Sequence, residues 1–141
     1  MRKRGAHDEQ RTARHRHPRL LRNALRVDAI ASGATGIGFL AAGRLHADLF
    51  GLPVALTLPT GLFLLAFAAF VGFTATRPEV NLRAVRSIIV LNLGWVLLSA
   101  AVLATGLAPL TALGTVYVLA QAAAVGLLAE LQFIGVRRAR R

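Results

Sequence analysis

The sequence predicts an all-α membrane protein, a four-helix bundle whose transmembrane helices run up and down in turn. Three observations predict it. The chain of 141 residues is 55% hydrophobic and only 16% charged, and its charges gather at the ends and in short connections. Four stretches are apolar for long enough to cross about 30 Å of hydrocarbon at about 1.5 Å per helical residue. The Lys and Arg residues fall where four spans would place nearly all of them on one side of the membrane.

The four spans are expected at about residues 24–43, 52–75, 84–106 and 110–136. The first is the weakest, because Arg26 and Asp28 lie in its first two turns and small residues fill much of the rest. The second carries no charge, and the third carries none from Ser87 onward. Glu130 is the only charged side chain of the fourth. Each span is therefore long and apolar enough to cross a bilayer.

Short connections rich in turn residues separate the spans. Gly51 and Pro53 open the second span, Arg77-Pro78-Glu79 follows it, and residues 106–109 link the third to the fourth. Proline is tolerated in the first turn of a helix, whereas Pro59 lies deeper and is expected to kink the second span. Such short links leave neighbouring helices antiparallel, which predicts up-down-up-down topology.

The arginines predict the orientation. Of the 17 basic residues, 16 lie in the N-terminal segment through Arg26, in the connection between spans two and three, or at the C-terminus, and only Arg44 lies elsewhere. An odd number of spans would separate the two Arg-rich ends, so this count supports four spans with both termini in the cytoplasm. The bias toward Arg, Ala, Gly, Leu and Val is typical of high-GC bacteria, so we expect a bacterial cytoplasmic (inner) membrane. The competing interpretation makes the first span a cleaved signal peptide.

The basic ends are expected to lie outside the bilayer. Residues 1–22 lack a hydrophobic period and are predicted to form a disordered Arg-rich tail, residues 23–136 the transmembrane domain, and residues 137–141 a second basic tail. The tails are expected to contact anionic lipid headgroups, or alternatively an acidic protein. Nucleic acid is not expected, since no aromatic residue is interleaved with the arginines. No metal site is expected at His7, His15 and His17, because the surrounding positive charge repels cations.

Four polar side chains in the cytoplasmic half of the spans form a candidate cluster. Asp28, Asn92 and Glu130 lie about 6–12 Å inside the boundary, and Arg86 lies in the first turn of span three. The cluster is expected either to lock the helices together through interfacial ion pairs, to bind a proton or substrate, or to recognise lipid headgroups.

A second set of polar residues marks one face of the fourth span. Tyr117, Gln121 and Gln132 share a face, and Glu130 lies on the opposite one. One face would meet the other spans and the other a second copy or a partner, so we expect a homodimer or a larger membrane complex. Rows of small residues at four-residue spacing, such as Ala34, Gly38 and Ala42, predict close helix packing.

The chain carries no pattern specific to a catalytic, cofactor or metal site. It has no cysteine, which excludes disulfides and thiolate chemistry. In the first outer connection, residues 44–50, an interfacial turn is expected to expose Leu45, Leu49 and Phe50 to lipid and His46 and Asp48 to water. That pair does not share a helix face, so catalysis is not expected there.

Several short motifs resemble those of known membrane proteins. Leu25-Arg-Val-Asp-Ala29, the loop from Ala47 to Pro53 and the stretch from Asn92 to Trp95 resemble uncharacterised small four-span integral membrane proteins of high-GC Gram-positive bacteria. This resemblance covers about residues 25–138 and implies no activity. The run from Gly36 to Gly43 is similar to the opening helix of DoxX-like proteins, although the acidic residue usual early in their second span is absent here.

We therefore expect a non-enzymatic membrane protein that acts as an accessory or scaffold subunit through helix–helix contacts. One alternative is a small dimeric proton-linked transporter that uses Asp28 and Glu130. The other, from the resemblance, is a DoxX-like membrane redox accessory.

Overall fold

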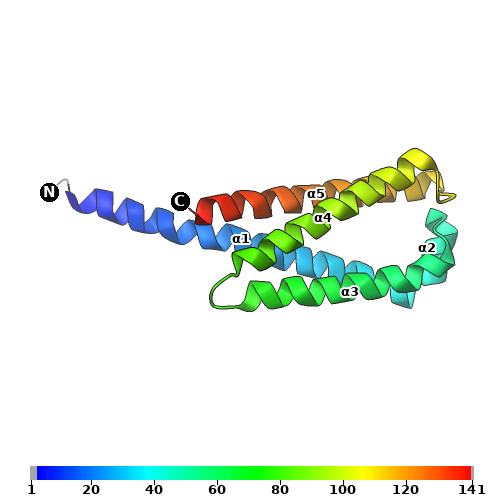
Figure 1. Cartoon of the computed structure of the whole chain (residues 1–141), viewed down its shortest axis with the longest axis horizontal. Helices are drawn as coiled ribbons and strands as arrows, with labels where there is room; N and C mark the ends of the chain where they lie inside the picture. The colour runs from blue at the N-terminus through cyan, green and yellow to red at the C-terminus, as the bar shows by residue number, and fades with distance from the viewer. Residues whose placement is uncertain (1–2, 141) are drawn as a thin grey trace.

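The computed structural model describes residues 3–140, with side chains from residue 19 onward, and this part of the chain contains five α-helices and no strand. They are α1 (Lys3–Ala41), α2 (Gly43–Phe50), α3 (Val54–Thr76), α4 (Leu82–Thr105) and α5 (Ala112–Ala139). The four long helices run antiparallel in sequence order, and α2 lies across one end (Figure 1). The predicted all-α four-helix bundle is confirmed.

Each long helix contains a stretch able to cross a membrane. The stretches are Arg19–Ala41, Val54–Thr76, Leu82–Thr105 and Ala112–Ala139, which overlap the four predicted spans. The bundle exposes large apolar side chains, among them Ile30 (72% exposed), Leu97 (71%) and Val116 (62%). A bundle inside a bilayer needs an apolar surface on all sides, because hydrocarbon rather than water surrounds it. The protein is a multi-pass membrane protein.

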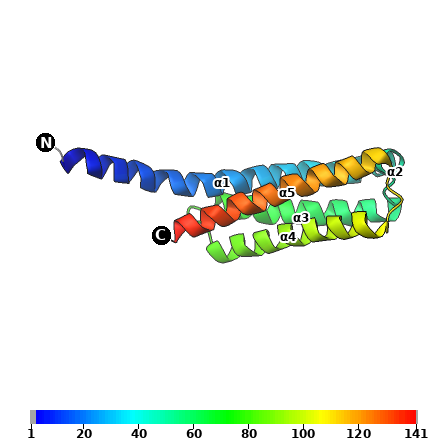
Figure 2. The ribbon, with the colours of Figure 1, turned by 90° about the horizontal axis from the view of Figure 1, so that it is seen from above.

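Helix α1 begins earlier than the sequence predicts. It starts at Lys3, inside the segment that was expected to be disordered, and extends beyond the ends of the other helices (Figures 1 and 2). Arg, Ala, Gln and Glu are all good helix formers. The polar segment therefore continues the helix of the first span, and the expectation of disorder for residues 3–22 differs from the structure.

The helices are packed unevenly around the bundle. α1 packs against α3 and α5, α4 packs against α5, and α3 and α4 touch little. α1 and α3 approach each other closely, since a Cβ on Gly36 would lie 3.0 Å from the carbonyl oxygen of Gly61. Farther along the same contact, a Cβ on Gly72 would lie 3.7 Å from the Cβ of Ala29. Small residues thus bring α1 and α3 together. They are not the predicted row of Ala34, Gly38 and Ala42, because Ala34 is exposed and Gly38 faces His46.

The helix ends are fixed by local hydrogen bonds. Asn81 caps α4, its Oδ1 accepting from the N–H of Arg83 at 2.9 Å, and the Thr111 hydroxyl caps α5 by accepting from the N–H of Gly114 at 2.9 Å. Gly51 (φ 70°) and Gly106 (φ 64°) end α2 and α4 in the left-handed conformation that glycine adopts without strain.

Helix α2 replaces the expected interfacial turn. Leu45, Leu49 and Asp48 are exposed as predicted. His46 does not face water, however. Its ring stacks on Phe39 at 4.7 Å between centroids and lies 5.5 Å from the ring of Phe50. Aromatic packing thus half-buries an imidazole whose Nδ1 already lies 2.9 Å from the carbonyl oxygen of Ala42.

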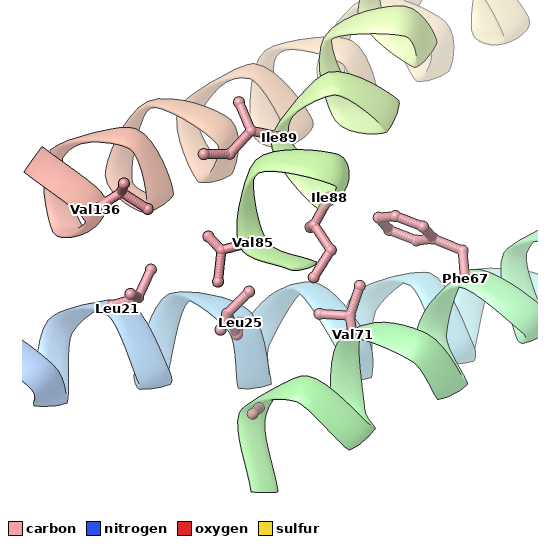
Figure 3. Close-up of a cluster of buried hydrophobic side chains, with 9 residues drawn as sticks. Leu21, Leu25, Phe67, Val71, Val85, Ile88, Ile89 and Val136 are labelled. Carbon is pink, nitrogen blue, oxygen red and sulfur yellow. The ribbon is translucent and has the colours of Figure 1, made fainter. Parts of the chain in front are cut away.

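The apolar core lies toward the end that carries the α3–α4 connection and the end of α5. Figure 3 shows side chains from all four long helices converging there. The cluster consists of Leu21, Leu25, Phe67, Val71, Ala75, Val85, Ile88, Ile89 and Val136. Directly beyond it, toward the middle of the bundle, the interior becomes polar.

Candidate functional site

A carboxylate is buried at the centre of the bundle. Asp28 of α1 is 1% exposed, and two amides from other helices donate to its Oδ2. The Nδ2 of Asn92 (α4) lies 2.7 Å away and the Nε2 of Gln132 (α5) lies 2.6 Å away. The hydroxyl of Ser32, one turn along α1, donates to Oδ1 over a longer 3.4 Å. One carboxylate thereby links three helices.

The donors to Asp28 are all neutral. Asn92 also lies 3.4 Å from the Oε1 of Gln132, so the two amides orient each other. Within the described part of the chain, no buried side-chain nitrogen or oxygen lacks a hydrogen-bond partner. Hydrogen bonds to a charged group contribute about 1.5–3 kcal/mol each, which offsets part of the cost of burying the carboxylate.

The structure brings together two of the four residues of the predicted cluster. Asp28 and Asn92 meet, whereas Arg86 and Glu130 are exposed on the outside of α4 and α5. Glu130 precedes Gln132 by two residues, about 200° around a helix, so only one of them can face Asp28. The amide does so and is fully buried. The sequence had placed Gln132 on the face opposite Glu130, but not next to Asp28.

A second hydrogen-bond network lies farther along the bundle. The indole Nε1 of Trp95 donates to the Oε1 of Gln121 at 2.6 Å, and the Nε2 of Gln121 donates to the hydroxyl of Ser99 at 2.9 Å. The Trp95 ring stacks on Phe63 of α3, with 6.0 Å between centroids. These contacts join α3, α4 and α5 at mid-bundle.

The predicted face of Tyr117, Gln121 and Gln132 is used within the chain. Tyr117 stacks on Phe50 at 4.4 Å between centroids, Gln121 bonds Trp95, and Gln132 bonds Asp28. This face therefore makes helix contacts inside the bundle. The outward face of α5 is the opposite one, which carries Glu130.

Two cavities lie on either side of Trp95. The first, of about 190 Å³, is lined by Asp28, Ser32 and Asn92 at one end and by aromatic rings along its wall. The second, of about 160 Å³, lies on the α2 side and is lined by hydroxyl and apolar groups. Trp95 and Gln121 line both cavities, so their hydrogen bond forms part of the partition.

Arginines stabilise the end of the bundle that lies beyond the apolar core. The Nη2 of Arg22 donates to the carbonyl oxygen of Pro78 at 2.9 Å, which ties α1 to the α3–α4 connection. The Arg77 guanidinium lies 4.1 Å from the ring centroid of Phe73, and that of Arg137 lies 5.7 Å from the ring centroid of Phe133. The Arg-rich segments thus meet at one end.

The site offers one buried acid next to a cavity. Among the described residues, no group of three His, Cys, Asp or Glu side chains comes together to hold a metal ion. What the arrangement can do chemically is accept hydrogen bonds from, or carry the counter-charge for, a group in the cavity. No protein-family model, curated protein or solved structure matches the chain.

Proposed function

We propose that this protein is a non-enzymatic scaffold or accessory protein of the bacterial cytoplasmic membrane that acts through helix–helix contacts, with both termini in the cytoplasm. The gathering of the Arg-rich segments at one end of the bundle supports that orientation, because basic residues are retained on the cytoplasmic side. The contact surface that we assign is the outward face of α5, and its first partner is a second copy of the chain.

The observation that carries this proposal is the position of Glu130. It is exposed on α5 seven residues before Arg137, about 10 Å along the helix, and its neighbours Leu127 and Phe133 are 58% and 51% exposed. A carboxylate that faces lipid at such a depth is unfavourable, because hydrocarbon supplies no hydrogen bond. A donor or cation on a neighbouring helix removes that penalty.

A second copy supplies such a cation. Gln132 bonds Asp28 and Gly135 packs on Leu21, so Glu130 lies within about one helical turn of the level of Arg26. Arg26 is also exposed, and α1 and α5 are adjacent. In a two-fold dimer, Arg26 of each copy would meet Glu130 of the other, which gives two identical ion pairs in a self-complementary interface.

Charge exchange tests the proposal. The chain contains no cysteine, so Leu127→Cys provides a single reactive thiol beside Glu130. We expect disulfide-linked dimers in membranes, lost when Arg26→Glu or Glu130→Arg is added and restored when the two charge variants are co-expressed. Glu79→Gln removes an exposed carboxylate in the α3–α4 connection and should leave cross-linking unchanged.

Two results would contradict the self-association. One is cross-linking that none of the charge changes alters. The other is cross-linking from Leu127→Cys only to a different protein, which would keep the α5 face as a contact surface but replace the second copy as its partner.

A small carrier is the second candidate function. It is favoured by the burial of Asp28 beside a cavity. Glu130 has no place in this version, since it faces away from that cavity.

A further inference from the structure

We propose that the cavity beside Asp28 is a binding site for a small organic cation, an ammonium group on a compact apolar body, with the Asp28 carboxylate as its counter-charge. The inference is independent of the dimer described above, since the cavity lies inside one chain.

The charge balance of the site points to a cation. Asp28 is 1% exposed, and the three side chains that donate to it carry no charge. Burying an ionised carboxylate is costly when only neutral dipoles compensate it, and a cation at hydrogen-bond distance reduces that cost. The end of the cavity that Asp28 lines is therefore the most favourable interior position for positive charge.

The hydrogen bonds of Asp28 leave acceptor capacity at one carboxylate oxygen. Its Oδ2 accepts two short bonds from Asn92 and Gln132, but its Oδ1 accepts only the long 3.4 Å contact from Ser32. A carboxylate has about four acceptor positions. An ammonium N–H can thus bond Oδ1 while the two amides stay in place.

The other side chains that line the cavity favour an organic cation over a metal ion. Asn92 and Gln132 turn their N–H groups toward Asp28, whereas a hard metal ion needs about six oxygen ligands. Phe63, Phe67 and Trp95 line the same cavity, and aromatic faces attract ammonium groups and accept apolar bodies.

The volume sets the size of the group that fits beside Asp28, while the wall at Phe63 and Leu91, 45% and 42% exposed, is partly open to the outside of the bundle. An apolar cavity of about 150 Å³ accommodates benzene. The cavity here is about 190 Å³, which fits a six-membered ring carrying one amino group. The apolar cluster around Leu25 and Ile88 closes the bundle on the Arg-rich side of Asp28, so a ligand cannot slide further that way.

The test uses a matched pair of probes, cyclohexylammonium and cyclohexanol, which share a ring and differ in charge. Trp95 is the only tryptophan of the chain and lines the cavity, so its fluorescence reports binding directly. On the full-length protein in lipid nanodiscs, we expect a saturable fluorescence change with the ammonium at a concentration at least tenfold lower than with the alcohol.

Three variants locate the site. Asp28→Asn should abolish the tenfold preference for the cation. Val125→Phe, which fills part of the same cavity, should abolish saturable binding of both probes while leaving Asp28 in place. Glu130→Gln, on the outside of α5, should bind as the wild-type chain does.

Several outcomes would overturn the proposal: equal affinity of the wild-type chain for both probes, a preference that survives in Asp28→Asn, or saturation that survives in Val125→Phe. Absence of any saturable response in the wild-type chain would also overturn it and would assign the cavity to water or lipid. The comparison of the two probes on the wild-type chain needs no variant, so it decides the matter even where a variant folds poorly.

Discussion

Replacing Asp28 by two different residues separates its hydrogen-bonding role from its charge. Asp28→Asn keeps the shape and keeps an oxygen that can accept from both Asn92 and Gln132, while its new NH₂ group can donate to the hydroxyl of Ser32. Asp28→Ala removes the acceptor and leaves two buried amides without their shared partner. The hydrogen-bond pattern therefore predicts a small loss of folding stability for Asp28→Asn and a large loss for Asp28→Ala.

The magnitudes follow from the contacts. Each unsatisfied buried amide costs about 1–3 kcal/mol, and removing a buried charge returns part of its desolvation cost. Interhelical hydrogen bonds in membranes are worth about 0.6 kcal/mol on average, because the unfolded chain in the membrane also finds partners. We therefore expect Asp28→Ala to lower the free energy of unfolding by about 2 kcal/mol, whereas Asp28→Asn should change it by less than about 1 kcal/mol.

Unfolding in mixed detergent micelles, followed by the fluorescence of the single Trp95, measures both values. A matched control is Ser87→Ala, whose exposed hydroxyl bonds only its own helix, to the carbonyl oxygen of Arg83. An Asp28→Ala protein as stable as Asp28→Asn would refute the reasoning, because the amides would then not depend on the carboxylate.

Three further predictions concern packing, orientation and capping. Gly61→Ala places a Cβ 3.0 Å from the backbone carbonyl oxygen of Gly36, which cannot turn aside, and should destabilise the α1–α3 contact by about 1–3 kcal/mol in thermal unfolding. Gly94→Ala meets nothing within 4 Å and should be neutral or stabilising. In intact cells a membrane-impermeant maleimide should label Asp48→Cys but not Glu79→Cys, and the reverse pattern would invert the proposed orientation. Asn81→Ala should cost about 1 kcal/mol through loss of the α4 cap, and an unchanged unfolding midpoint would contradict that role.

The sequence was sufficient for the fold because long apolar runs specify membrane spans, and the placement of the arginines favours an even number of them. The sequence did not show where α1 begins. The polar segment contains good helix formers, but it has no hydrophobic periodicity that would mark a helix. The sequence was also insufficient for His46, whose position between two aromatic rings depends on how α2 folds back on the bundle.

The candidate site was predicted in part, for a geometric reason. Asp28 and Asn92 were expected together because both lie in the cytoplasmic half of their spans, and they do meet. The third partner was expected to be Glu130, since a charged residue in a span usually faces inward. Helical phase alone shows that Glu130 and Gln132 cannot both face Asp28, but it does not say which one does. The rotation of α5 is set by the packing of Gly135 on Leu21 and by the contact of Gln121 with Trp95, which only the structure shows.

The two carboxylates, Asp28 and Glu130, are consequently in different environments and need different hydrogen-bond or ion-pair partners. Asp28 is surrounded by protein, so neutral amides and a neighbouring cavity determine its partners. Glu130 faces outward, so only another helix or the membrane surface can supply its partner. Glu130 lies about 200° around α5 from Gln132, the α5 residue that bonds Asp28, so neutralising one carboxylate leaves the surroundings of the other unchanged. Asp28→Asn should therefore alter cation binding without altering cross-linking through Leu127→Cys, and Glu130→Gln should weaken cross-linking without altering cation binding. If either change affected both measurements, the bundle would be coupling its interior to its lipid-facing surface, and assembly and binding would have to be treated as one function.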